Sequence, residues 1–123
     1  TMGSGIAVSF LRAGYGTVRL YDSNPDGLKR GVSLISNILN GDVKKGRQTA
    51  LRAKHMLDHV LQPDSSKSLT CMKDCHVVVE AAFESMPVKQ AIFQQLDQIV
   101  TSPHALLLSN TSTLSVDEIA SVV

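Results

Sequence analysis

Short β-prone runs alternate with helical stripes along this chain, and this alternation restricts the fold more than any other feature of the sequence. The strongest run is His-Val-Val-Val-Glu-Ala at 76–81, because an unbroken β-branched run predicts a strand that is buried on both faces. Residues 17–21 predict another strand and 105–109 a further buried one. Strands that alternate with helices form parallel sheets with right-handed crossovers, so the sequence predicts an α/β fold.

Apolar residues at helical spacing predict the helices that connect these strands. Gly14 and Gly41 stand where helices commonly end, and Pro25 and Pro87 stand where a first turn tolerates proline. The segment Ser-Val-Asp-Glu at 115–118 is a capping box, which announces one more helix. The predicted helices are 6–13, 25–41, 42–62, 87–99 and a last one from 115 onward.

The segment between 62 and 76 has a weaker pattern. Pro-Asp-Ser-Ser at 63–66 predicts a break in the chain's regular structure, and 68–70 predicts a short edge strand.

The series of elements begins on a helix that is entered through glycines, Gly3 and Gly5. A helix opened by Gly-x-Gly normally follows a strand, and in a doubly wound sheet that strand lies in the middle. We therefore expect a Rossmann-type doubly wound parallel sheet that is truncated at both ends, with residues 1–123 forming part of one dinucleotide-binding domain.

The composition excludes several classes of protein. Of the 123 residues, 43% are hydrophobic, which is enough to bury a core. Twelve Lys+Arg against eleven Asp+Glu, with 4% aromatic residues, argue against a nucleic-acid partner. Apolar runs such as 105–108 are far shorter than the roughly 18 residues of a membrane span. Cys71 and Cys75 lack a second ligand pair, so partly buried thiols explain them better than a metal site.

Asp22 is the residue that points most directly to a ligand. It ends the predicted strand 17–21 and lies nineteen residues after Gly3, close to the spacing of about 20 at which an acid receives the adenosine ribose of a dinucleotide. A carboxylate accepts hydrogen bonds from the ribose diol but repels a 2′-phosphate, and Ser23 and Asn24 offer no cation to that phosphate. We expect NAD rather than NADP. The alternative is that Asp22 only caps the turn before Pro25.

Two further loops follow predicted strands at the same edge of the sheet. Residues 80–89 follow one strand with small residues, Ala81 among them, that allow close approach to the backbone. Asn-Thr-Ser at 110–112 follows the next strand and supplies side-chain donors and acceptors. Because open α/β sheets bind ligands beyond the carboxyl ends of their strands, we expect both loops to border the cofactor.

Four segments together resemble the NAD-binding domain of the 3-hydroxyacyl-CoA dehydrogenases. They are Thr-Met-Gly-Ser-Gly-Ile-Ala at 1–7, the strand ending in Asp22, Val-Glu-Ala-Ala-Phe-Glu at 79–84 and Ser-Asn-Thr-Ser at 109–112. The likeness covers nearly the whole chain. It implies oxidation of the 3-hydroxyl of a fatty acyl-CoA to a 3-oxo group, with hydride passing to NAD, as in β-oxidation.

The resemblance also implies roles for single residues. Gly3 and Met2 match the end of the pyrophosphate loop, and Asp22 matches the ribose acid. Ser112 matches a serine that lies between nicotinamide and substrate hydroxyl, and Glu80 is expected to order its loop. The residues expected to bind the cofactor are Met2, Gly3, Asp22, Ala81, Glu84, Lys89, Asn110 and Ser112.

Other parts of the family pattern are absent from this sequence. The acid–base histidine of the family and its glutamate follow the Ser-Asn-Thr-Ser motif, so we expect them beyond Val123, together with a helical domain through which the parent protein would form a homodimer. The histidines at 55, 59, 76 and 104 do not match that motif. Lys44 and Lys45 fall in the segment that meets CoA in relatives, but they match poorly and read as a solvated face.

Several alternatives remain open at this point. The parent could be a bifunctional hydratase–dehydrogenase that contains the same module, or a non-catalytic, crystallin-like nucleotide-binding relative. The sequence indicates no secretory signal, and it does not distinguish between mitochondrial matrix, peroxisome and cytoplasm.

Overall fold

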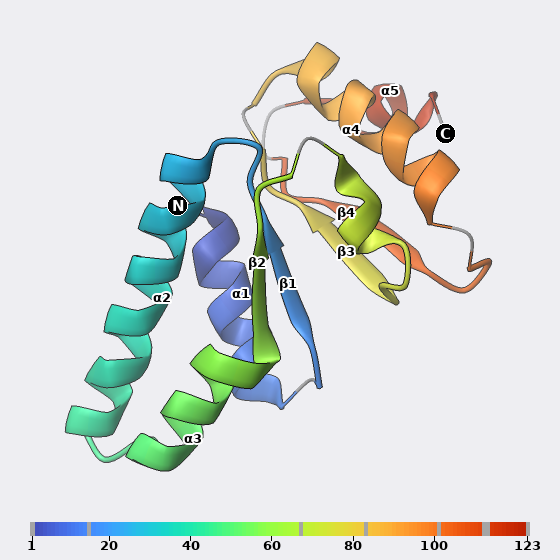
Figure 1. The fold of residues 1–123 in the computed structure, drawn as a ribbon. Coiled ribbons are helices and arrows are strands. Elements are labelled where there is room, and N and C mark those ends of the chain that lie inside the picture. Colours follow the sequence, from blue (N-terminus) through green and yellow to red (C-terminus); the bar gives the residue numbers. More distant parts are fainter. Residues whose placement is uncertain are drawn as a thin grey trace. The chain divides into compact units, whose positions relative to one another are not determined.

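The structure is a computed structural model that describes residues 2–14, 16–66, 68–82, 84–100, 102–111 and 114–122, with the side chain of Met2 left out. The chain divides into two compact units, Thr1–Lys67 and Ser68–Val123. Each unit holds a parallel pair of strands together with several helices (Figure 1).

The first unit contains α1 (Met2–Ala13), β1 (Val18–Tyr21), α2 (Pro25–Lys44), α3 (Ala50–His55), a π-helix (Met56–Val60) and β2 (Leu61–Asp64). Strands β1 and β2 are parallel, with Val18 opposite Leu61 and Tyr21 opposite Asp64. Figure 1 shows α1 and α2 running side by side next to this pair of strands.

The core of the first unit forms where α1 and α2 meet. Leu11 from α1, and Ile35 and Leu39 from α2, are almost completely buried. The guanidinium of Arg12 joins the two helices by donating from Nε and Nη2 to the two carboxylate oxygens of Asp42, over 3.1 and 3.0 Å. Gly31 sits at the closest approach, because a Cβ added there would lie 2.9 Å from Oγ of Ser4.

Turn residues delimit these elements much as the sequence predicts. Gly14 ends α1 with a φ of 85°, a left-handed conformation that glycine adopts without strain. The side chain of Asn24 accepts hydrogen bonds from the backbone N–H groups of Asp26 and Gly27 and so caps α2, which begins at Pro25. The prediction that α2 ends at Gly41 was wrong, because the helix continues to Lys44 and Gly41 keeps a helical conformation.

The second unit contains a 3₁₀-helix (Leu69–Met72), β3 (Val77–Glu80), α4 (Met86–Ile99), β4 (Leu106–Ser109) and α5 (Val116–Ala120). Strands β3 and β4 are parallel, with Val77 opposite Leu106 and Glu80 opposite Ser109. Helix α4 packs against α5 and the 3₁₀-helix. The buried apolar residues of this unit are Leu69, Met72, Val78, Phe93, Leu96 and Ile119.

The structure corrects two predicted elements. Residues 61–64, expected as a helix end and a break, form strand β2, which tolerates Pro63 because β2 pairs with a single neighbour among the described residues. Residues 68–70, expected as an edge strand, begin the 3₁₀-helix, whose first turn is held by a hydrogen bond from the N–H of Thr70 to Oγ of Ser68.

The strands of the second unit are covered on one face, where the sequence predicted burial on both. Val78 and Glu80 are buried, whereas Leu106 and Leu108 are 57% and 47% exposed. Successive residues of a strand face opposite sides of the sheet, so one side of this pair packs within the unit and the other does not. Val77 and Val79, which stand opposite Leu106 and Leu108, are half-buried.

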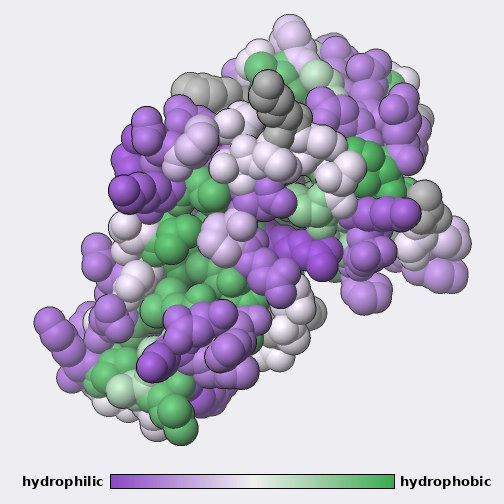
Figure 2. Space-filling view, in the orientation of Figure 1, coloured by the Kyte–Doolittle hydropathy of each residue, from purple (hydrophilic) through white to green (hydrophobic). Residues whose placement is uncertain are grey.

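The surface is mixed in character. Figure 2 shows hydrophobic residues at the surface of the first unit, flanked by hydrophilic ones on α2 and α3. Large apolar side chains exposed there are Leu34 and Leu51. No helix within the described ranges is both long enough and apolar enough to cross a bilayer.

Candidate cofactor-binding site

Asp22 lies at the carboxyl end of β1, directly before the first turn of α2. Its N–H extends the parallel ladder by donating to the carbonyl oxygen of Asp64 over 3.1 Å. Oδ1 accepts a hydrogen bond from the N–H of Asn24 over 2.9 Å, and Oδ2 accepts none from the described residues. The half-buried carboxylate therefore keeps one oxygen available at the tip of the strand.

The carboxylate of Asp22 occupies space that a side chain at position 27 would fill. A Cβ built on Gly27 would lie 2.6 Å from Oδ2 of Asp22. Asp22 does order the turn, as the alternative interpretation expects, but Asn24 caps the helix. A turn role thus uses one oxygen of Asp22 and leaves the other for a ligand.

The N-terminal end of α1 is suited to an anion. The helix begins at Met2, runs for 12 residues and has no acidic side chain in its first turn. Gly3 is half-buried there. Unpaired N–H groups and the helix dipole favour a phosphate at such an end.

A chain of polar side chains links the ends of β3 and β4 in the second unit. Lys89 of α4 donates from Nζ to Oε2 of Glu80 over 2.7 Å, and both side chains are about 98% buried or more, with exposed fractions of 1% and 2%. Ser109 Oγ donates to the other oxygen, Oε1 of Glu80, over 2.6 Å. The N–H of Ala82 also donates to Oε2, over 2.6 Å.

The same chain of polar groups continues outward to Glu84. Nζ of Lys89 lies 3.5 Å from Oε1 of Glu84, whose side chain is 36% exposed. Thr111, in the loop after β4, donates from Oγ1 to Oε1 of Glu84 over 2.6 Å. The N–H of Leu114 in turn donates to Oγ1 of Thr111 over 3.1 Å. The loops after β3 and β4 are therefore connected through Glu84 and Thr111.

The structure places the predicted site residues in both units. Met2, Gly3 and Asp22 belong to the first unit. Met2 and Gly3 lie at the start of α1, and Asp22 directly follows β1. Ala81, Glu84, Lys89 and Asn110 belong to the second, where Asn110 is exposed and its N–H donates to the carbonyl oxygen of Glu80 over 2.8 Å. Ser112 lies outside the described residues.

Sequence reasoning included Ser109 and Thr111 in the motif at 109–112 without giving either residue a role of its own, and it missed Gly27. Ser109 ends β4 and Thr111 follows it by two residues, on either side of Asn110, so their place at the carboxyl end of a strand was an available signal. Gly27 gave no signal in the sequence, because its importance depends on the side-chain position of Asp22.

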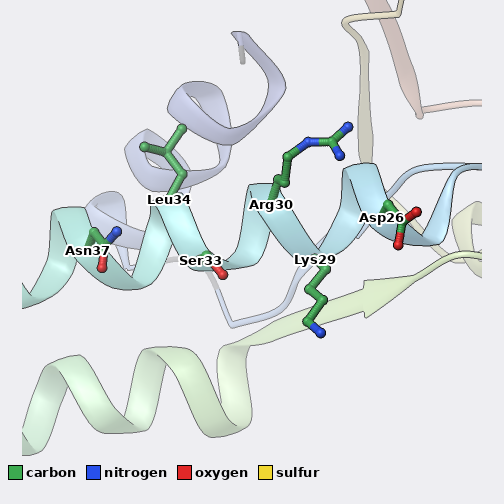
Figure 3. Close-up of a pocket in the computed structure, with 6 residues that line it drawn as sticks. All are labelled: Asp26, Lys29, Arg30, Ser33, Leu34 and Asn37. Carbon is green, nitrogen blue, oxygen red and sulfur yellow. The ribbon is translucent and has the colours of Figure 1, made fainter.

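A separate hollow of about 560 Å³ lies along α2 and is lined by Asp26, Lys29, Arg30, Ser33, Leu34 and Asn37. Figure 3 shows that these side chains come from one helix and diverge, with Arg30 and Leu34 on one side of α2 and Lys29 on the other. Side chains that do not converge give a ligand no enclosed environment. This hollow is therefore not the cofactor site.

Strands in parallel pairs, joined by helices, with an acid at the tip of β1, define a dinucleotide-binding α/β domain of the Rossmann type. More narrowly, the chain belongs to the family of 3-hydroxyacyl-CoA dehydrogenase NAD-binding domains, whose model matches residues 1–123. This confirms the family and the α/β fold expected from the sequence.

The names of individual relatives are consistent with this family. The chain is 37% identical over 121 residues to the probable 3-hydroxybutyryl-CoA dehydrogenase of Bacillus subtilis, covering 98% of this chain and 40% of the relative. It is 38% identical over 120 residues to the peroxisomal bifunctional enzyme of Cavia porcellus, covering 98% of this chain but 16% of that enzyme. The chain thus spans two fifths of the first relative and under a fifth of the second.

Solved structures show the same fold. The crystal structure of (S)-3-hydroxybutyryl-CoA dehydrogenase from Ralstonia eutropha matches with a TM-score of 0.87 and 30% identity, over 99% of this chain and 41% of that one. The crystal structure of 3-hydroxybutyryl-CoA dehydrogenase from Escherichia coli matches with a TM-score of 0.84 and 34% identity, over 95% of this chain and 24% of that one.

Proposed function

We propose that this chain is the NAD-binding part of an enzyme that oxidises a 3-hydroxyacyl-CoA to a 3-oxoacyl-CoA, as in fatty acid β-oxidation. The family of the chain and the names of its relatives support this proposal. NAD supplies the acceptor for the hydride that leaves the substrate carbon. The residues of this chain bind and orient that acceptor.

Asp22 is the observation that carries the cofactor assignment. Its Oδ1 is fixed by the N–H of Asn24, while Oδ2 accepts no hydrogen bond from the described residues. A carboxylate held in this way at the end of a strand is suited to accept hydrogen bonds from the adenosine ribose through Oδ2. The start of α1, with Met2 and Gly3, receives the pyrophosphate in this proposal.

The loops of the second unit serve the rest of the cofactor. Ala81 lets the cofactor approach the backbone, and Glu84 and Asn110 present exposed polar groups to it. For Ser112, which lies outside the described residues, we propose a place between nicotinamide and the substrate hydroxyl, as the family resemblance implies. Lys89 takes part in the same site from a buried position.

The acid–base group of the reaction is a histidine supplied from outside this chain. His76 and His104 precede β3 and β4, so they lie at the amino ends of strands, whereas ligands bind beyond the carboxyl ends. His55 and His59 lie at the end of α3 and in the π-helix, with their rings 5.4 Å apart. The helical domain beyond this chain would provide that histidine, its glutamate partner and the homodimer contact.

Both single-function and bifunctional enzymes are candidates for the parent protein, because relatives of the two kinds are 37% and 38% identical to this chain. The presence of a hydratase domain in the parent protein would identify it as a bifunctional enzyme.

Replacing Asp22 tests the proposal. Asp22→Ala in the full-length protein removes hydrogen bonds between a charged acceptor and the ribose, worth about 1.5–3 kcal/mol, so NAD should bind roughly 10- to 150-fold more weakly in calorimetry. NADP should be less affected, because the carboxylate repels its 2′-phosphate. Asp26→Ala is the matched control, since Asp26 is exposed one turn further on. Equal losses for both cofactors would contradict the ribose role of Asp22.

A further inference from the structure

Two histidines lie close together on the surface of the first unit, where α3 passes into the π-helix. His55 is the last residue of α3, His59 belongs to the π-helix, and both are exposed. The centroids of their rings are 5.4 Å apart, and the ring planes are tilted by 39°. The proposed function assigns no role to either histidine.

The backbone fixes the spacing of this pair. Helical conformation continues through the junction, since His55 has φ and ψ of −60° and −44° and Met56 has −58° and −45°. The N–H of Leu61 then donates to the carbonyl oxygen of Met56, an i→i+5 hydrogen bond of the π type. Side chains four residues apart are neighbours on a helix surface. Both histidines therefore project from one face of a continuous helix.

The opposite face of the same helix is anchored. Ala53, Met56 and Val60 are buried in the hydrophobic core of the first unit. Because these residues hold the helix in place, the histidines stay on the solvent side. The pair is thus held on a rigid element and is open to a ligand from solution.

The charges beside the pair favour one class of ion over another. Arg52 and Lys54 are exposed cations, and Asp58 is an exposed anion. This surrounding does not attract a hard cation such as Mg²⁺, which prefers carboxylate and carbonyl oxygen. Imidazole nitrogen is instead a ligand for zinc, copper and nickel ions.

The separation of the rings matches a tetrahedral metal centre. Zn²⁺ binds imidazole nitrogen at about 2.0–2.1 Å, and that nitrogen is about 1.1 Å from its ring centre, so each ring centre would lie about 3.2 Å from the ion. Two such rings at the tetrahedral angle of about 109° have their centres about 5.2 Å apart. The separation in this structure is 5.4 Å. One zinc ion therefore fits between the rings at nearly their present separation.

We propose that His55 and His59 form a two-histidine site for a divalent transition ion, with Zn²⁺ as the best geometric match and one nitrogen of each ring as a ligand. Within the part of the chain that the structure describes, no group of three or more His, Cys, Asp or Glu could hold a metal. Water therefore completes the coordination, and the ion binds reversibly. The site precedes β2 at its amino end, whereas dinucleotides bind beyond carboxyl ends, so the inference is independent of the proposed function.

Protection from diethyl pyrocarbonate tests this site in the full-length protein. The reagent acylates imidazole that carries no metal, and peptide mass spectrometry reads the reaction at each histidine separately. At a ZnCl₂ concentration of about ten times the dissociation constant, the reaction of His55 and His59 should slow roughly tenfold. EDTA should restore the rate, and MgCl₂ should give no protection. His104, which is exposed in the second unit, is the internal reference.

Two variants distinguish a shared ion from binding by single imidazoles. His55→Gln and His59→Gln each keep an exposed polar side chain, so both should melt like the unmodified protein in the absence of metal. Loss of one ligand should weaken zinc binding at the remaining histidine roughly tenfold or more. Most of its protection should then disappear. His104→Gln is the matched control and should leave the protection of His55 and His59 unchanged.

Three outcomes overturn the inference. If zinc leaves the reaction of His55 and His59 unchanged, the pair binds no ion. If His59 stays fully protected in the His55→Gln protein, a single imidazole holds the ion and the pairing is wrong. If His104 is protected as strongly as the pair, zinc binds any exposed histidine of this protein and the pair is not a distinct site.

Discussion

Gly27 offers a sharp test of how Asp22 is placed. A Cβ at position 27 would lie 2.6 Å from Oδ2 of Asp22, whereas ordinary contacts begin at 3.4 Å, so the carboxylate would have to retreat by about 0.8 Å. Asp22 has two side-chain torsions and lies at the half-buried end of β1, so its side chain moves rather than the backbone. We expect Gly27→Ala to break the 2.9 Å hydrogen bond between Oδ1 and the N–H of Asn24.

The change in the free energy of unfolding caused by Gly27→Ala is the sum of two opposing effects. A hydrogen bond to a charged group is worth about 1.5–3 kcal/mol, and exposure of Asp22 reduces this to about 1 kcal/mol. Replacing glycine by alanine within a helix stabilises by about 0.5–1 kcal/mol. Gly27→Ala should therefore be almost neutral. Gly41→Ala, in the same helix with nothing within 4 Å of its Cβ, should gain the full helical contribution.

Urea unfolding followed by circular dichroism measures this difference. We expect Gly41→Ala to be more stable than Gly27→Ala by about 1 kcal/mol, or roughly 3–5 °C in Tm. In an Asp22→Ala background the obstruction is gone, so both substitutions should stabilise equally. If Gly27→Ala stabilises as much as Gly41→Ala while Asp22 is present, the close contact between Gly27 and Asp22 is refuted.

Two further predictions concern the core of the first unit. Asp42→Ala should lower the free energy of unfolding by about 1–2 kcal/mol, because it leaves the half-exposed guanidinium of Arg12 without its partner and removes the link between α1 and α2. The double variant Arg12→Leu with Asp42→Ala should lose no more stability than Asp42→Ala alone. Additive losses in urea unfolding would contradict the pairing. Leu39→Ala should cost about 2–5 kcal/mol, because Leu39 is 0% exposed. Leu51→Ala is its control, since Leu51 is 80% exposed, and a similar loss in both variants would count against the core.

Much of the fold could be predicted because local chemistry and tertiary structure agree. Gly14 permits the left-handed conformation that ends α1, whereas Pro25 and the β-branched run 77–79 restrict the backbone, and the elements begin and end close to these residues. Strand β2 could not be predicted in the same way. The helical spacing of apolar residues continues through Met56 and Val60, which form the π-helix. Pro63 is unusual in a strand, and β2 forms because its backbone pairs with β1, which the local sequence does not indicate.

The candidate cofactor-binding site was likewise predictable only where the local sequence carried a signal. Asp22 could be placed at a strand tip from the β-prone run 17–21 that it follows, and the comparisons confirm the family and its cofactor, NAD. The sequence analysis did not predict the burial of Lys89, because lysines are mostly exposed. Yet Lys89, Phe93 and Leu96 follow each other at intervals of four and three, the spacing of a buried helical face, and all three are buried. A charged residue on such a stripe was the signal for an internal ion pair.

The close approach of Ser4 and Gly31 has a consequence for how this sequence can diverge. The two positions share the space of one small side chain, because a Cβ at 31 would lie 2.9 Å from the hydroxyl oxygen of Ser4. A larger residue at one position requires a smaller one at the other, so we expect substitutions at positions 4 and 31 to occur together in related sequences. A lineage that gained a methyl group at 31 would first have to move or lose the hydroxyl at 4, for example by exchanging Ser4 for alanine.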